Sequence, residues 1–155
     1  AAALLNTGCG KSVGDNDDVV LPERFPDEIG LHDRFIEGTP VARTEFSPEN
    51  VSFSYDSYRI ADQEVVKIQR VGTFMRGNGK VRLVVEGHCD ERGSRQYNLS
   101  LGEHRALAVR ARLVGMGIDS GRIQTRSYGE ERPLDPGHNE SAWRRNRRVE
   151  FVLYR

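Results

Sequence analysis

Residues 81–109 constrain the fold more than any other part of the chain, because they combine a strand pattern, a polar turn and a helix pattern. Val81, Leu83 and Val85 recur at every second position, as in a strand that buries one face. A run of ionisable side chains follows in residues 86–93, EGHCDERG. So much charge does not fill a core, so this turn is expected at the surface.

A helix is expected directly after the turn, from about Ser94 to Gly115. Gly93 can adopt a left-handed conformation, and Ser94 can cap the first turn of the helix. Apolar residues then recur at roughly helical spacing, which marks the face that packs on the core. These residues are Leu99, Ala106, Val109 and Leu113.

A second face of this helix carries Asn98, Leu101 and Arg105, which fall at positions i, i+3 and i+7. The turn aspartate, Asp90, can point into the same cleft as Arg105. A carboxylate suits an ammonium group, and a guanidinium fork suits a carboxylate. The pair therefore fits a zwitterionic ligand, although the same residues would also form a structural ion pair.

The remaining elements complete an α+β pattern. A strand is expected over 51–55, a helix over 62–76, a strand over 123–128, a loop over 129–138, a helical turn over 139–147 and a last strand over 149–153. The order β-α-β-α-β-β predicts a two-layer sandwich, with the helices on one face of a mixed sheet.

Charge divides the chain into two halves. Residues 1–64 contain 5 Lys and Arg against 13 Asp and Glu, and residues 65–155 contain 18 against 10. The basic half favours an anionic partner or is simply a solvated surface, and charge does not decide between them. The two cysteines, Cys9 and Cys89, show no metal-ligand spacing, and no apolar run of 18 residues occurs.

Three ordered motifs carry a family resemblance. GHCDERG begins at Gly87, YNLSLGEHRA at Tyr97 and NRRVEF at Asn146. Together they resemble the OmpA C-terminal-like domain family and, within it, the peptidoglycan-associated lipoproteins. The resemblance covers about residues 49–155 and implies an OmpA-like sandwich with helices on one face of the sheet.

The resemblance also implies a ligand, which is the diamino acid of the peptidoglycan stem peptide, usually meso-diaminopimelate. The matching acid and arginine in the family grip this residue. Cys89 replaces a threonine that is commoner in the family, and this puts one side-chain contact in doubt. Either Arg147 or Arg148 is expected to face the cleft, with the other in solvent, and Arg147 is favoured. The expected ligand-binding residues are Asp90, Arg105, Asn98, Leu101, Phe53, Asp56, Cys89, Asn146 and Arg147.

The first residues, AAALLNTGC, resemble the end of a bacterial lipoprotein signal, with Cys9 as the lipidated residue. Asn6 departs from that pattern, which prefers an aliphatic residue three places before the cysteine. We expect a residual signal over 1–9, a flexible acidic linker over 10–37 and a peptidoglycan-binding domain over 38–155.

The resemblance implies a non-enzymatic tether between the outer membrane and the cell wall. Lipid on Cys9 would hold the chain in the inner leaflet, with the domain in the periplasm. The implied partners are peptidoglycan and the periplasmic propeller protein of the Tol system, and no nucleic acid or cofactor is expected. The alternatives are an OmpA-like wall-binding protein outside the Tol system and a peptidoglycan hydrolase.

Two enzymatic or metal hypotheses remain weak. His88, Cys89, Asp90 and Glu91 suggest zinc, but consecutive residues of an extended chain alternate faces, and no HExxH or CxxC motif supports them. Glu86 with the neighbouring acids suggests a glycosidase. A cleft for a sugar chain usually has more aromatic side chains than this region offers.

Overall fold

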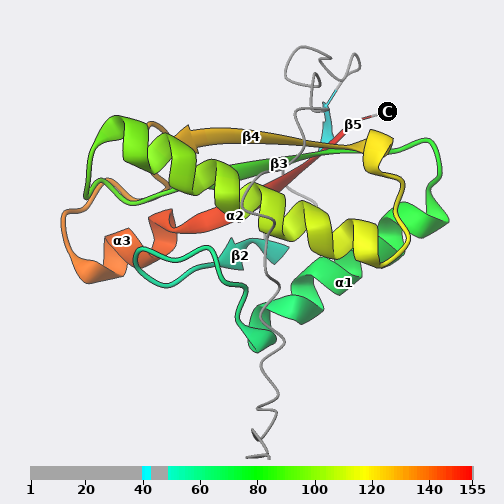
Figure 1. Ribbon diagram of the computed structural model, residues 1–155, viewed down its shortest axis with the longest axis horizontal. Helices are drawn as coiled ribbons and strands as arrows, with labels where there is room; N and C mark the ends of the chain where they lie inside the picture. Colours follow the sequence, from blue (N-terminus) through cyan, green and yellow to red (C-terminus); the bar gives the residue numbers. More distant parts are fainter. Residues whose placement is uncertain (1–39, 43–48, 155) are drawn as a thin grey trace, which may run out of the picture.

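The computed structural model describes residues 49–154 in full and the backbone of residues 40–42. The expected signal over 1–9 and the whole of the expected linker over 10–37 therefore lie outside the described residues. The elements in chain order are β1 (Pro40–Ala42), β2 (Val51–Ser52), α1 (Asp62–Gly77), β3 (Arg82–His88), α2 (Arg95–Gly115), the 3₁₀ turn η2 (Ser120–Arg122), β4 (Ile123–Gly129), α3 (Glu140–Asn146) and β5 (Arg148–Tyr154) (Figure 1).

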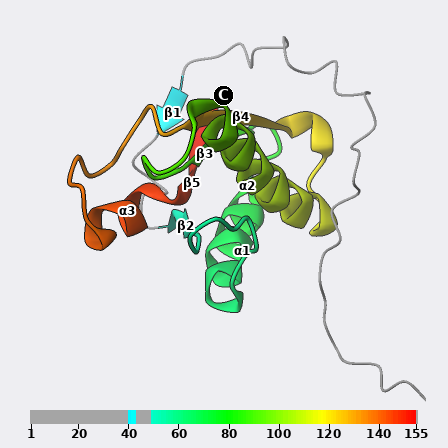
Figure 2. The ribbon, with the colours of Figure 1, turned by 60° about the vertical axis from the view of Figure 1, so that its left-hand side comes forward.

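The sheet is mixed, as expected. Its strand order is β1-β5-β3-β4, and β2 pairs with β5 as well. β3 runs parallel to β4 and antiparallel to β5, so α2 is the crossover between two parallel strands. α2 packs on β3 and β4, and α1 packs on α2 (Figures 1 and 2). The predicted α+β sandwich with helices on one face is confirmed.

The core lies between the helices and the sheet. Helical spacing places Ile68, Val71 and Met75 of α1 in it, and all three are fully buried. The strand alternation is also confirmed, because Leu83 and Val85 have no exposed surface. Other core residues come from α2, β4 and β5 and include Ala106, Val109, Leu113, Ile123, Val149, Phe151 and Leu153.

Two glycines let α2 approach the sheet beside the polar turn. A Cβ at Gly87 of β3 would collide with the carbonyl oxygen of Gly102 in α2. A Cβ at Gly102 would in turn collide with the hydroxyl of Ser127 in β4. The helix therefore lies closer to the strands here than any larger residue would permit, which fixes the distance between α2 and the turn that follows β3.

The end of α1 is closed by an arginine that the sequence patterns did not single out. Arg122 in η2 donates to the carbonyl of Met75 at 3.0 Å, of Asn78 at 2.8 Å and of Val81 at 2.7 Å. These carbonyls lie at and beyond the helix end, where backbone acceptors lack intrahelical partners. Arg122 thus joins the α1–β3 connection to the start of β4.

The first core strand is shorter than expected. β2 pairs with β5 only at Val51 and Ser52, and the N–H of Phe53 donates to the carbonyl of Arg147 at 3.0 Å. The chain then turns away, because Asp56 adopts a left-handed φ of 50°. Tyr55, expected on the inner face of the strand, is 59% exposed instead.

Candidate functional site

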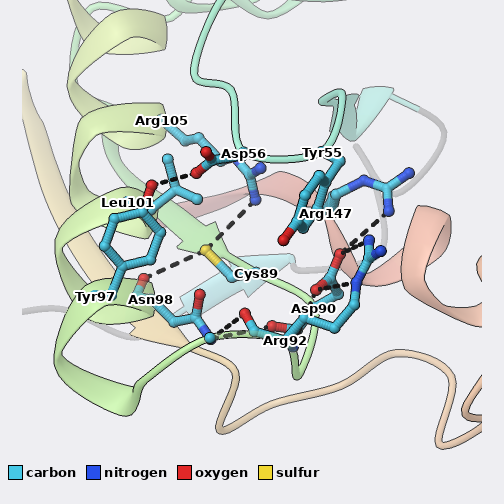
Figure 3. A pocket seen from close by; sticks show the side chains of 11 residues that line it. Tyr55, Asp56, Cys89, Asp90, Arg92, Tyr97, Asn98, Leu101, Arg105 and Arg147 are labelled. Atoms are coloured by element: carbon cyan, nitrogen blue, oxygen red, sulfur yellow. Dashed lines mark hydrogen bonds and ion pairs between the residues drawn. The ribbon is translucent and has the colours of Figure 1, made fainter.

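A cavity of about 110 Å³ lies where the β2–α1 loop, the β3–α2 turn and the first turns of α2 meet (Figure 3). Arg147, at the start of β5, closes one side. Of the nine residues expected to bind ligand, the structure brings seven together here. They are Asp56, Cys89, Asp90, Asn98, Leu101, Arg105 and Arg147.

Phe53 and Asn146 are not among the lining residues. The side chain of Phe53 is 4% exposed and belongs to the core, while its carbonyl accepts from Nε of Arg147 at 3.0 Å. The side chain of Asn146 binds the backbone of Leu134 and Asp135 at 2.8–2.9 Å. Phe53 thus holds the lining residue Arg147 in place, whereas Asn146 ties the β4–α3 loop to the end of α3.

Asp90 is saturated with hydrogen bonds. Its Oδ1 accepts from the backbone N and from Nε of Arg92, both at 3.1 Å. Its Oδ2 accepts from Nη2 of Arg92 at 2.8 Å and from Nη1 of Arg147 at 3.1 Å. Burial disfavours the charged form, but the hydrogen bonds from Arg92 and Arg147 outweigh it and lower the pKa of Asp90. These four bonds fill the acceptor sites of one carboxylate.

Arg92 is held in place by aromatic rings. Its guanidinium carbon lies 4.0 Å from the ring centroid of Tyr55 and 4.2 Å from that of Trp143. Cation–π contacts on two rings fix the side chain while it binds Asp90. The sequence patterns did not single out Arg92, although its position two residues after Asp90 in the polar turn was an available signal.

Arg105 is fully buried and binds mostly backbone. Its Nε donates to the carbonyl of Ser57 at 2.8 Å, Nη1 to that of His88 at 2.8 Å, and Nη2 to that of Ser54 at 3.2 Å. Nη1 also lies 3.4 Å from Sγ of Cys89. Burial lowers the pKa of Arg105. Among the described residues, Nη2 binds only the carbonyl of Ser54, so its second N–H can donate to a ligand.

Asp56 is the open carboxylate of the cavity. It accepts a hydrogen bond from the hydroxyl of Tyr97, which raises the pKa of that tyrosine. Within residues 49–154, Asp56 forms no ion pair with arginine or lysine. Figure 3 shows it on the α2 side of the cavity, across from Asp90 and its two arginines. The cavity therefore contains one carboxylate that is already neutralised and one that is not.

Cys89 lies at the base of the cavity and is 4% exposed. Burial raises the pKa of its thiol to about 11, against a smaller opposite effect of Arg105. The Sγ–H donates to the carbonyl of Asn98 at 3.3 Å, and the backbone N donates to Gly129 at 2.8 Å. The side chain expected to weaken a ligand contact therefore satisfies its hydrogen bonds inside the protein.

The side chain of Asn98 binds several acceptors around the β3–α2 turn. It is 2% exposed, and its Nδ2 donates to the carbonyls of Asp90 at 3.3 Å and Arg92 at 3.1 Å and to the carboxylate of Glu130. The cap predicted for α2 is present, since Oγ of Ser94 accepts from N of Tyr97. The helix start and the polar turn thus form one hydrogen-bonded unit.

The two neighbouring arginines face different surroundings. Arg147 lines the cavity, as favoured from the sequence, and also binds Glu140 at 2.8 Å. The expectation that Arg148 points to solvent was wrong, because it is 5% exposed. Its Nε donates to Glu150 at 2.6 Å, and its Nη2 to the carbonyl of Arg132 at 3.2 Å. Glu150 supplies the partner that allows this burial.

The hypothetical zinc ligands of the turn do not converge. Glu91 accepts from Nε1 of Trp143 at 2.9 Å and from Nδ1 of His138 at 2.8 Å, and these bonds lower its pKa. The described residues that could together hold a metal are instead Glu86, His88 and Glu150, whose ligand atoms lie within 4.8 Å of one another. Arg148 already supplies a positive charge to Glu150 there.

Comparison with known proteins assigns the family. Residues 52–147, more than half of the chain, match the OmpA family. The chain belongs to the OmpA family. Among curated relatives named peptidoglycan-associated lipoprotein, that of Haemophilus influenzae is 39% identical over 112 residues, covering 72% of this chain and 73% of its own length. That of Legionella pneumophila is 34% identical, covering 98% and 90%.

A third relative of that name, from Pseudomonas aeruginosa, is 44% identical over 64% of this chain, and the match spans only 58% of that protein. Among solved structures, the peptidoglycan-associated lipoprotein of Burkholderia pseudomallei superposes with a TM-score of 0.66 at 36% identity, covering 67% of this chain and 88% of that chain. The C-terminal domain of Helicobacter pylori MotB has a TM-score of 0.64 at 22% identity, covering 68% and 84%, and shows the shared fold alone.

None of the helices in the described part of this OmpA-family chain is both long enough and apolar enough to cross a membrane.

Proposed function

We propose that this chain is a non-enzymatic peptidoglycan-binding protein that ties the outer membrane to the cell wall. The observation that carries the proposal is the charge arrangement of the cavity, where Asp56 and Asp90 face Arg92, Arg105 and Arg147. A small cavity with both signs of charge suits a zwitterionic group. The names of the relatives support peptidoglycan as the polymer that presents it.

The ligand would be the diamino acid of the stem peptide, whose D-centre carries an ammonium and a carboxylate. The carboxylate would accept from the remaining Nη2 N–H of Arg105. The ammonium would lie between Asp56 and Asp90. The carboxylate of Asp56 accepts a hydrogen bond from Tyr97 and has room for another, and Asp90 would give up a bond from Arg92 to accept one from the ammonium. Charge-assisted contacts of this kind contribute about 1.5–3 kcal/mol each.

The attachment to the membrane is proposed at Cys9, which lies outside the described residues. Lipid on Cys9 would anchor the chain in the inner leaflet of the outer membrane, and residues 10–37 would carry the domain into the periplasm. Labelling with radioactive palmitate tests this, with Cys9→Ala as the comparison. Equal labelling of the parent and the variant would refute the anchor.

A partner in the Tol system is part of the same proposal. The periplasmic propeller protein of that system would compete with peptidoglycan for overlapping surface. Purified propeller protein should therefore displace a labelled muropeptide from the chain. Simultaneous binding of both would refute the overlap of the two surfaces. Failure of the propeller protein to bind would place the chain outside the Tol system, as a wall-binding protein of the OmpA family.

Hydrolysis finds less support in the geometry. A glycosidase needs one carboxyl group whose pKa is raised so that it can act as an acid. The pKa values of Asp90 and Glu91 are lowered instead, by hydrogen bonds from Arg92 and Arg147 and from Trp143 and His138. A zymogram on purified cell wall separates the two functions, and clearing would refute the binding-only proposal.

The main test is calorimetric titration with two muramyl tripeptides, one ending in meso-diaminopimelate and one in lysine. The lysine form lacks the carboxylate that Arg105 would bind, so the parent should bind it about ten- to a hundredfold more weakly. Asp56→Asn and Asp90→Asn should weaken binding of the diaminopimelate form. Glu131→Gln, an exposed acid outside the cavity, is the matched control. A folded parent that binds neither peptide would refute the proposal.

A further inference from the structure

Two of the exposed aromatic side chains line the cavity, and a third follows shortly after in the β2–α1 loop. Among the described residues, three large aromatic side chains are more than 40% exposed, namely Tyr55 at 59%, Tyr97 at 50% and Tyr58 at 43%. Tyr55 and Tyr97 line the cavity from opposite sides (Figure 3). Tyr58 follows Asp56 by two residues, and its ring lies 5.4 Å from that of His104, the neighbour of Arg105 in α2.

The sequence patterns did not predict this arrangement of aromatic side chains. Tyr55 and Tyr58 belong to the β2–α1 loop, whereas Tyr97 belongs to the first turn of α2. The loop reaches α2 because the buried guanidinium of Arg105 binds the carbonyls of Ser54 and Ser57. The expectation that this region has too few aromatic side chains for a sugar chain holds for residues 75–127 alone, and the fold adds rings from outside that range.

The cavity itself is too small for more than a fraction of a polymeric ligand. Its volume of about 110 Å³ is well below the roughly 300–1,000 Å³ of pockets that enclose whole drug-sized molecules. It therefore accommodates the charged end of one amino acid. The rest of a stem peptide, and the sugar to which that peptide is attached, must lie across the mouth.

We infer that the exposed ring of Tyr58, two residues after the cavity-lining Asp56 and packed against His104 of α2, forms a second subsite that takes the sugar ring of the glycan strand. This rests on the proposed function, because the stem peptide in the cavity brings the sugar to this surface. A pyranose ring presents a face of C–H groups that packs on an aromatic ring, while its hydroxyls need polar neighbours. Ser57, Arg59 and His104 supply such groups next to Tyr58.

The surroundings of the tyrosines favour this assignment over a purely structural role. The other large apolar side chains that are exposed, Val66, Val114 and Leu134, are on α1, at the end of α2 and in the β4–α3 loop. None of these three lines the cavity. By contrast, Tyr55 and Tyr97 line the cavity, and Tyr58 lies in the same loop as Tyr55, two residues after the lining residue Asp56.

The test compares three ligands with the same peptide charge: N-acetyl-L-alanyl-γ-D-glutamyl-meso-diaminopimelate, the N-acetylmuramyl conjugate of the tripeptide and the disaccharide conjugate. Calorimetry on the full chain should show tighter binding when sugar is added, by about three- to tenfold, which is the range for one aromatic contact. Tyr58→Ala should abolish this gain and leave the affinity for the acetylated tripeptide within twofold. Tyr58→Phe should retain the gain, and Leu134→Ala should behave as the parent.

The outcomes separate this subsite from the proposed function. If the parent binds the acetylated tripeptide but sugar adds nothing, the subsite is refuted and peptide binding stands. The same holds if Tyr58→Ala weakens all three ligands by one factor, because the effect then comes from the cavity. If the parent binds no ligand, the proposed function itself fails and the subsite with it.

Discussion

The two sides of the cavity differ in how much of their hydrogen bonding is used by the protein itself. On the inner side, Arg105 binds three backbone carbonyls and Asp90 accepts four hydrogen bonds. On the outer side, Asp56 is exposed and is bound within the described residues by Tyr97. The inner side thus contributes mainly to stability and the outer side mainly to binding.

The largest effect is expected for Arg105→Ala, which tests whether the inner side is structural. The change removes the donors for the carbonyls of Ser54, Ser57 and His88 and frees the β2–α1 loop. Loss of several buried hydrogen bonds to a charged group should lower the free energy of unfolding by about 3–5 kcal/mol. Urea denaturation measures it. A loss below about 1 kcal/mol would mean that Arg105 serves the ligand rather than the fold.

Asp90→Asn should have the next largest effect on stability. It removes the carboxylate that binds Nη1 of Arg147, which is 5% exposed, and leaves that arginine only the carboxylate of Glu140, on Nη2, within the described residues, so it should cost about 2–3 kcal/mol. Glu131→Gln is the control, because the carboxylate of Glu131 is exposed.

The pH dependence gives the same prediction a second readout. Burial opposes ionisation of Asp90, but Arg92 and Arg147 hold its folded pKa below the ordinary value of about 3.9. A carboxylate with a lowered folded pKa stabilises the protein fully above its unfolded pKa, and this stabilisation is lost as pH falls toward the folded pKa. The parent should therefore lose stability below about pH 4 more steeply than Asp90→Asn. Parallel profiles would contradict the assignment.

Asp56→Asn should separate binding from stability. Its carboxylate is exposed and accepts one bond from Tyr97, so urea denaturation should shift by less than about 0.5 kcal/mol. Affinity for the diaminopimelate muropeptide should nevertheless fall about tenfold or more, because the ammonium loses its open carboxylate. An unchanged affinity would mean that the ammonium binds Asp90 alone. Arg92 would then have to give up its hydrogen bonds to Asp90 when the ligand binds.

The difference between the two sides also explains what the sequence could predict. Helical spacing and strand alternation predicted α1, α2 and β3, since these patterns report burial of one face. The spacing within one turn and one helix placed Asp90 and Arg105 in one cavity. The left-handed turn at Asp56, beyond the end of β2, was not predicted, because no glycine marks the position.

Contacts between distant segments could not be read from spacing. Arg92 lies between Tyr55, from the β2–α1 loop, and Trp143, from α3, and only the fold brings these three together. Arg148 was expected in solvent because its neighbour Arg147 was assigned to the cleft and consecutive residues of a strand alternate faces. Its burial depends on Glu150, two residues later on the same strand, whose carboxylate accepts a hydrogen bond from the guanidinium and balances its charge.

The smallest effect on function is expected at Cys89, which tests whether the inner side is closed to small molecules. Burial raises the pKa of this thiol to about 11, so only about one molecule in a thousand carries the thiolate at pH 8. In a Cys9→Ala background, a disulfide reagent should react at least about a hundredfold more slowly with the folded protein than with the chain unfolded in guanidinium. Cys89→Thr should leave muropeptide affinity within about twofold, because the thiol binds Asn98 inside the protein rather than facing the ligand. Rapid labelling of the folded chain would show that the inner side opens on the timescale of the reaction. The division between a structural and a binding side would then hold only for the closed conformation.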